Sequence, residues 1–205
     1  MDMSQAIEAD ANVASRLIDR HVQANLGQKR ALEYGDKHYS YYDLAALVNR
    51  AGNLLKSLGV RPGAQVMLLM PPSPAYVGAL IGAMKIGAVP ALLDPGDAQP
   101  ALALVHASEL EKLGGALPKD KLVVVGEAPP GYRSFVELMR AQPSSLATEA
   151  VSADAGALAA AGKQGPTILS HAQLQALLDG EGDGGLGRAA GVLRALAKGQ
   201  TARLA

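Results

Sequence analysis

Apolar positions along the chain follow two patterns, and the first is the three-to-four-residue spacing of helices. The clearest example runs from Tyr41 to Leu58, where leucine, valine and alanine form one stripe and Gly59 ends the pattern. This spacing places apolar side chains on one helix face, and glycine is common just past a helix end. A similar stripe predicts a first helix from Asn12 to Asn25, and another predicts an amphipathic helix over residues 186–197.

The second pattern is the short apolar run of a strand. The stretch "RALEYGDKHYSYYDL" indicates a hairpin, with strands at Ala31–Tyr34 and Lys37–Ser40. Gln65–Met70 and "DKLVVVGE" do not alternate with polar residues, which is typical of strands buried on both faces of a parallel sheet. Another strand is expected at Val89–Leu93, and short helices are expected at Ser108–Leu113 and Phe135–Arg140. Alternating strands and helices predict an α/β fold, a mostly parallel sheet flanked by helices. The segment 144–161 is rich in alanine and serine, and its pattern favours neither state.

The segment 74–93 is apolar enough to suggest a membrane span. Lys85 lies near its middle and Pro90 interrupts it, so a buried helix over residues 74–86 and a buried strand explain it better. Gly78 and Gly82 form a small-residue face that should let this helix approach the sheet closely. The N-terminal sequence lacks the basic start and apolar run of a secretory signal. We expect a cytoplasmic protein without a membrane partner.

Composition excludes several classes of partner and of catalytic site. The 205 residues include 19 basic and 19 acidic ones, so no basic excess points to a nucleic-acid partner. The absence of cysteine excludes disulfides and thiolate chemistry, and the four scattered histidines do not have the spacing of metal ligands. Ser170 is expected to cap a helix that begins at His171 rather than to form a catalytic pair with it. Asp94 and Asp97 are expected to flank a turn. We assign no catalytic residue and no metal site.

The C-terminal part of the chain changes in character. Residues 180–187, "GEGDGGLG", predict a flexible linker between a domain over residues 1–179 and a helix with its tail over residues 188–205. Leu186, Leu193 and Leu196 lie on the apolar stripe of that helix. The stripe either docks a partner or folds back on the chain's own core.

Four pieces together cover most of residues 12–175: "NVASRLIDRHV", "YSYYDLAALVNRAGNLLKSLGVRPGAQVMLLMPPSPAYVGALIGAMKIGAVPALLDP", "KDKLVVVGEAPPGYRSFVELM" and "ILSHAQL". In residue types, turn signals and order they resemble the start of the adenylate-forming acyl-CoA synthetases, and most closely their benzoate-CoA ligase branch. The resemblance implies the N-terminal subdomain of that fold. For a complete member it implies an AMP-forming acid–CoA ligase.

Two features depart from the family pattern. Residues 96–100 stand where the family continues through a further helix and strand, which indicates an internal deletion near residues 95–101. The family's phosphate loop reads roughly Ser-Gly-Thr-Thr-Gly-x-Pro-Lys-Gly, whereas this chain has "AGKQGPTILSH". Gly162, Lys163, Gly165 and Thr167 are what remains to bind phosphate, and a plain surface loop explains them equally well. We expect no cofactor beyond weak binding of ATP or AMP.

The chain ends before the region in which the family keeps its adenine, ribose and acyl contacts and its catalytic lysine. Positioning and charge stabilisation supply most of the catalysis of adenylation, so we expect the isolated chain to be inactive. Our leading hypothesis is a catalytically incomplete, synthetase-like protein that acts by association, as a homo-oligomer or as a partner of a full-length or complementary ligase chain. Loss of the neighbouring subdomain would leave an apolar face to be covered. The alternatives are one half of a split ligase, a nucleotide- or CoA-sensing module, and a truncated product without function.

Overall fold

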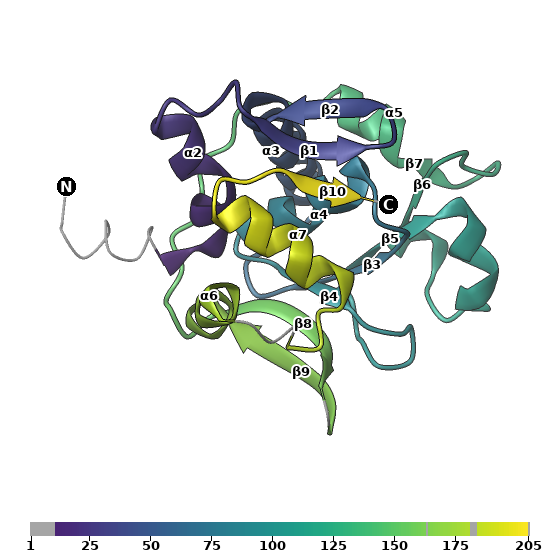
Figure 1. Ribbon diagram of the computed structural model, residues 1–205. Helices are drawn as coiled ribbons and strands as arrows, with labels where there is room; N and C mark the ends of the chain where they lie inside the picture. The colour runs from purple at the N-terminus through teal and green to yellow at the C-terminus, as the bar shows by residue number, and fades with distance from the viewer. Residues whose placement is uncertain (1–10, 163, 181–183, 205) are drawn as a thin grey trace.

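A seven-stranded sheet organises the chain, which a computed structural model describes over residues 11–162, 164–180 and 184–204 (Figure 1). The strand order is β7-β6-β5-β3-β4-β8-β9, and every neighbouring pair is parallel except β8 and β9. The strands are β3 (Gln65–Leu69), β4 (Val89–Leu92), β5 (Leu102–His106), β6 (Leu122–Val125), β7 (Arg133–Ser134), β8 (Gly156–Gly162) and β9 (Gly165–Ser170). The predicted α/β class with a mostly parallel sheet is confirmed.

A second sheet has three strands in the order β10-β1-β2. β1 (Arg30–Tyr34) and β2 (Lys37–Ser40) form the predicted hairpin, and Gly35 adopts a φ of +54° in its turn. β10 (Ala202–Leu204) was not predicted, and it pairs parallel with β1, with Leu32 opposite Ala202. The second sheet therefore joins the two ends of the described chain.

Seven helices and two 3₁₀ turns lie in the described part of the chain. They are η1 (a π-helix, Ser15–Asp19), α2 (Arg20–Gln23), α3 (Tyr41–Ser57), α4 (Pro74–Lys85), α5 (Phe135–Arg140), α6 (His171–Asp179) and α7 (Arg188–Ala197), with 3₁₀ turns η2 (Ala107–Leu113) and η3 (Lys119–Lys121). The first helix predicted from residues 12–25 is thus a π-helical stretch continued by α2. No helix in the described ranges is long and apolar enough to cross a bilayer.

α3 has the predicted boundaries because both of its ends carry local signals. The Ser40 hydroxyl accepts from the backbone N–H of Asp43, whose carboxylate accepts from the backbone N–H of Ser40, which is a capping box. The buried stripe includes Leu44, Val48 and Leu55, and the helix ends before Gly59, whose φ is +84°.

The small-residue face of α4 packs against α3, which corrects our expectation that it would face the sheet. A Cβ on Gly82 would lie 2.8 Å from the carbonyl oxygen of Val48 and 2.9 Å from the backbone nitrogen of Gly52. A Cβ on Gly78 would lie 2.7 Å from the side chain of Leu47, also on α3. The two helices therefore approach each other backbone to backbone.

A buried ion pair ties η1 to the end of α4. Lys85 Nζ lies 2.6 Å from Asp19 Oδ1, and the side chain of Lys85 is 3% exposed. The hydroxyl of Thr148 donates to Asp19 Oδ2 at 2.7 Å. A buried ammonium needs a paired and hydrogen-bonded partner. The lysine that argued against a membrane span is thus neutralised inside a buried helix.

The segment 93–101 connects β4 to β5 without a helix, although β3 lies between these two strands in the sheet. Parallel strands are usually joined by a helical crossover of a dozen or more residues. Ala98 packs against two small clusters under this connection, one around Met67 and one around Val89. The internal deletion inferred near residues 95–101 stays a prediction.

Candidate functional site

A hollow of about 460 Å³ lies at the carboxyl ends of β3 and β4. It is bordered by Ala161 of β8 and by the start of α7, and its charged residues are Asp94, Asp97, Glu109 and Arg188. Open α/β sheets bind ligands at this edge, outside the carboxyl ends of their strands. We call this the carboxyl-end hollow, and its position makes it the first candidate site.

Negative charge dominates the carboxyl-end hollow. Asp94 and Asp97 flank the predicted turn, in which the backbone N–H of Asp97 donates to the carbonyl of Asp94 at 2.9 Å. Glu109 lies 2.5 Å from Lys112, and this partner lowers the pKa of the carboxyl group. With Glu109 paired to Lys112, Asp94 and Asp97 outnumber Arg188, and this negative surplus disfavours a polyphosphate that brings no cation. In the described ranges, no group of three or more histidine and acidic side chains could hold a metal ion.

The predicted phosphate residues lie at the end of the β8–β9 hairpin. Gly162 pairs with Gly165, which adopts a φ of +120°, and a Cβ on Gly162 would lie 2.5 Å from Thr167 Oγ1. The Thr167 hydroxyl donates to the carbonyl of Gly165 at 3.4 Å, so it is engaged by the loop itself. Lys163 lies outside the described residues. The structure brings the other three together on an exposed tip, next to Ala161 of the carboxyl-end hollow.

The helix expected from its leucine stripe is α7, and it folds back on the chain's own core. Leu186 is 4% exposed, and Leu193 and Leu196 are fully buried, so these three side chains are not presented to a partner. The Tyr41 hydroxyl donates to the carbonyl of Gln200 at 3.1 Å and fixes the segment after α7. Of the predicted linker 180–187, residues 181–183 lie outside the described residues.

Ser170 caps α6 as expected. Its hydroxyl accepts from the backbone N–H of Gln173, and the Gln173 side chain accepts from the backbone N–H of Ser170. His171 is fully buried, and its Nδ1 accepts from the backbone N–H of Val13 at 3.1 Å. Burial lowers the pKa of His171 to about 4. The two residues therefore have structural contacts and do not form a nucleophile–base pair.

Comparisons with known proteins agree with this geometry. A family model described as AMP-binding enzyme matches residues 18–111. The 3-hydroxybenzoate–CoA/4-hydroxybenzoate–CoA ligase of Thauera aromatica is 30% identical over 187 residues, covering 82% of this chain and 36% of the ligase. The 3-hydroxybenzoate–CoA ligase of Aromatoleum sp. (strain CIB) is 32% identical over 153 residues, covering 67% of this chain and 29% of the ligase. The chain is a relative of the AMP-binding enzymes and matches their N-terminal region.

Solved structures extend this relationship to nearly the whole chain. The anthranilate CoA ligase AuaEII, in complex with anthranoyl-AMP, gives a TM-score of 0.79 at 25% identity, covering 95% of this chain and 45% of that one. A benzoate CoA ligase from Burkholderia xenovorans LB400 gives a TM-score of 0.77 at 22% identity, covering 94% of this chain and 45% of the ligase. The chain thus has the N-terminal subdomain fold of acyl-CoA ligases, and it spans about a third of the two hydroxybenzoate ligases and less than half of the two solved ligases.

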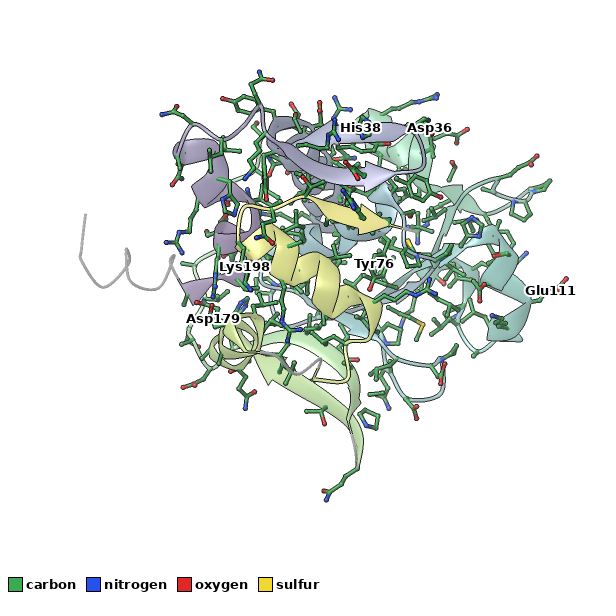
Figure 2. The ribbon with its side chains drawn as sticks, in the orientation of Figure 1. Asp36, His38, Tyr76, Glu111, Asp179 and Lys198 are labelled. Carbon is green, nitrogen blue, oxygen red and sulfur yellow. The ribbon has the colours of Figure 1, made fainter. Side chains whose placement is uncertain are left out.

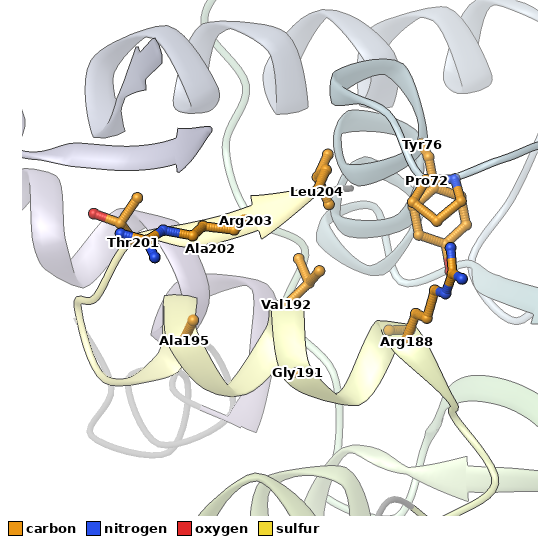
Figure 3. A pocket seen from close by; sticks show the side chains of 11 residues that line it. Pro72, Tyr76, Arg188, Gly191, Val192, Ala195, Thr201, Ala202, Arg203 and Leu204 are labelled. Carbon is orange, nitrogen blue, oxygen red and sulfur yellow. The ribbon is translucent and has the colours of Figure 1, made fainter. Parts of the chain in front are cut away.

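Sequence reasoning missed a second hollow in this chain, a groove of about 560 Å³ between α7 and β10 (Figure 3). Val192, Ala195 and Leu204 form its apolar part, and Pro72 and Tyr76 close one end, where Arg188 points toward them. Burial raises the pKa of Tyr76 to about 12. Four residues, among them Tyr76 and Arg188, also border the carboxyl-end hollow, so the two hollows lie side by side. No local signal could have found this α7–β10 groove, because it depends on the pairing of β10 with β1.

Proposed function

We propose that the chain is a catalytically incomplete relative of the acyl-CoA ligases that acts by binding a separate polypeptide carrying the remaining part of a ligase fold. The α7–β10 groove carries this proposal. An apolar groove beside a sheet edge is a common docking surface for a protein segment.

The edge beside the groove has capacity for a further strand. Within the described ranges β10 pairs with β1 alone, so it is the outer strand of its sheet. An outer strand presents unpaired N–H and C=O groups that a strand from another chain can pair with. The partner's apolar side chains would then lie against Val192 and Ala195.

The occupant is inferred from the share of each relative that this chain matches. The unmatched part of AuaEII amounts to more than half of that protein. A ligase body of that size supplies both a strand for the β10 edge and apolar side chains for the groove. The carboxyl-end hollow supports catalytic incompleteness, because its net negative charge and the shortened phosphate loop leave little to hold ATP.

The test is to size the purified chain by light scattering, alone and mixed with the unmatched C-terminal part of the Thauera ligase expressed as a separate chain. We expect a one-to-one complex that weakens about tenfold or more in Gly191→Glu, because this change places a charge in the apolar groove. Gly191 is exposed and has open space around its Cβ position, so the variant should fold. Val136→Glu is the matched control, since Val136 is a 46% exposed apolar residue outside the groove.

Three outcomes would contradict the proposal. One is a monomer that binds no ligase fragment, the second is a homodimer that excludes the fragment, and the third is equal weakening by both variants.

A second candidate function is one half of a split AMP-forming ligase, and the partial coverage of the relatives favours it specifically. Pyrophosphate release distinguishes this split-ligase function from association alone. Pyrophosphate release with ATP and hydroxybenzoate should then occur only when the two chains are mixed. A complex without pyrophosphate release supports association alone.

A further inference from the structure

A third hollow, of about 540 Å³, lies where three segments distant in sequence meet. α2 and the segment after it contribute Arg20, His21 and Lys29, the end of α6 contributes Asp179, and the residue after α7 contributes Lys198. Figure 2 shows Asp179 and Lys198 on the same side of the molecule. This basic hollow shares no residue with the carboxyl-end hollow or with the α7–β10 groove.

Positive charge remains in the basic hollow after its ion pair is taken into account. Arg16 also lines it and pairs with Asp179 through both carboxylate oxygens. Arg16 is the main reason that the pKa of Asp179 is lowered, and these two charges neutralise each other. In the described part of the chain, the side chains of Arg20, Lys29 and Lys198 have no hydrogen-bonded or ion-paired partner, although the charge of Lys198 also acts on Asp179 through space. The hollow thus has a surplus of three cations.

Compensation of helix ends does not account for these cations. α6 and α7 both end at this hollow, and helix C-termini carry partial negative charge that basic side chains often offset. Other groups already perform that role. Arg16 donates to the carbonyl of Gln175 at 3.5 Å, and Arg194 donates to that of Leu177 at 2.9 Å. The ring of His21 bonds to the carbonyl of Leu196 at 2.7 Å.

We propose that the basic hollow is a binding site for a small phosphate-bearing molecule, with Arg20, Lys29 and Lys198 as its charge partners. Its volume lies within the range of small-molecule sites. Arginine and lysine recognise phosphate, the first through its planar fork and the second as a mobile point charge. A phosphate dianion suits a surplus of three cations better than a monocarboxylate does, because the Coulomb attraction grows with the charge of the ligand.

The test is a titration of the full chain with inorganic phosphate against sodium chloride of equal ionic strength, followed by backbone amide NMR. We expect saturable shifts of the amide signals of Lys29, Lys198 and Gly199. The double variant Lys29→Ala/Lys198→Ala should raise the dissociation constant about tenfold or more, since it removes two of the three cations that would contact the phosphate. Both side chains are exposed, so their truncation should leave the fold intact.

Lys37→Ala/Lys56→Ala is the matched control, because it removes the same charge from exposed positions outside the hollow. The proposal is overturned if the shifts are linear up to the highest concentration, if they cluster at the β8–β9 hairpin instead, or if both double variants weaken binding equally. The site does not depend on the proposed association, because phosphate binding and complex mass are measured separately.

Discussion

Adding one methyl group should have opposite effects at two glycines of this fold. At Gly82, a Cβ would lie 2.8 Å from a carbonyl oxygen and 2.9 Å from a backbone nitrogen of α3. Backbone atoms cannot rotate away, so α3 and α4 must separate by some tenths of an ångström. At Gly191, on the exposed side of α7, an added Cβ would meet nothing within 4 Å.

The magnitudes follow from two competing effects. Alanine favours a helix interior over glycine by about 1 kcal/mol at either position. Overpacking a close contact costs about 1–3 kcal/mol, and a contact with backbone lies at the upper end of that range. We therefore expect Gly82→Ala to lower the free energy of unfolding by about 1–2 kcal/mol and Gly191→Ala to raise it by up to about 1 kcal/mol.

Urea unfolding followed by far-UV circular dichroism measures both changes. The midpoints should move in opposite directions while the slope stays constant, because a constant slope means that the surface exposed on unfolding is unchanged. A Gly82→Ala variant as stable as the wild type would contradict this expectation. So would a gain of stability in both variants, because the α3–α4 approach would then have no steric consequence.

Three further predictions concern polar side chains with specific partners. Burial lowers the pKa of His171 to about 4, so as the pH falls below about 6.5 the unfolded state binds a proton that the folded state does not. Between pH 6.5 and 4 the free energy of unfolding should fall on the order of 2–3 kcal/mol more in the wild type than in His171→Asn, as measured by urea titrations repeated at each pH. Asparagine is chosen because it keeps a hydrogen-bond acceptor. Asp19→Asn should lower the free energy of unfolding by about 2–4 kcal/mol, measured by thermal unfolding, because it leaves Lys85 without a charge partner. Adding Lys85→Met should restore most of the lost stability. Equal stability of the single and double variants would contradict this prediction. Ser170→Ala should cost about 1 kcal/mol through the lost cap, and Ser170→Asp should cost less in the same assay.

Local signals made much of the fold predictable from the sequence. The β1–β2 hairpin and α3 have their turn, cap and stop residues within or beside them, so their boundaries were predicted to within a residue. β8 was not predicted because its alanines have little intrinsic preference for strands. It forms a strand because small side chains fit between β4 and β9, where a Cβ on Gly156 would lie 3.0 Å from Ile168.

The candidate sites were less predictable, because their residues come together only through tertiary contacts. The glycines of the shortened phosphate loop were located from the sequence, since they lie within one hairpin. Asp94 and Asp97 were correctly expected at a turn, but the sequence gives no sign that this turn faces Arg188 across a hollow. The α7–β10 groove and the basic hollow depend on segments more than a hundred residues apart in the chain.

The pairing of β1 with β10 also affects how the protein is made. β1 is synthesised well before β10, so its parallel neighbour exists only after Leu204 has left the ribosome. At about 5–20 residues per second, translation takes roughly 10–30 s to go from Leu32 to Ala202. During that interval the nascent hairpin has one open side, and a holding chaperone that shields it should raise the yield of native protein in cell-free translation.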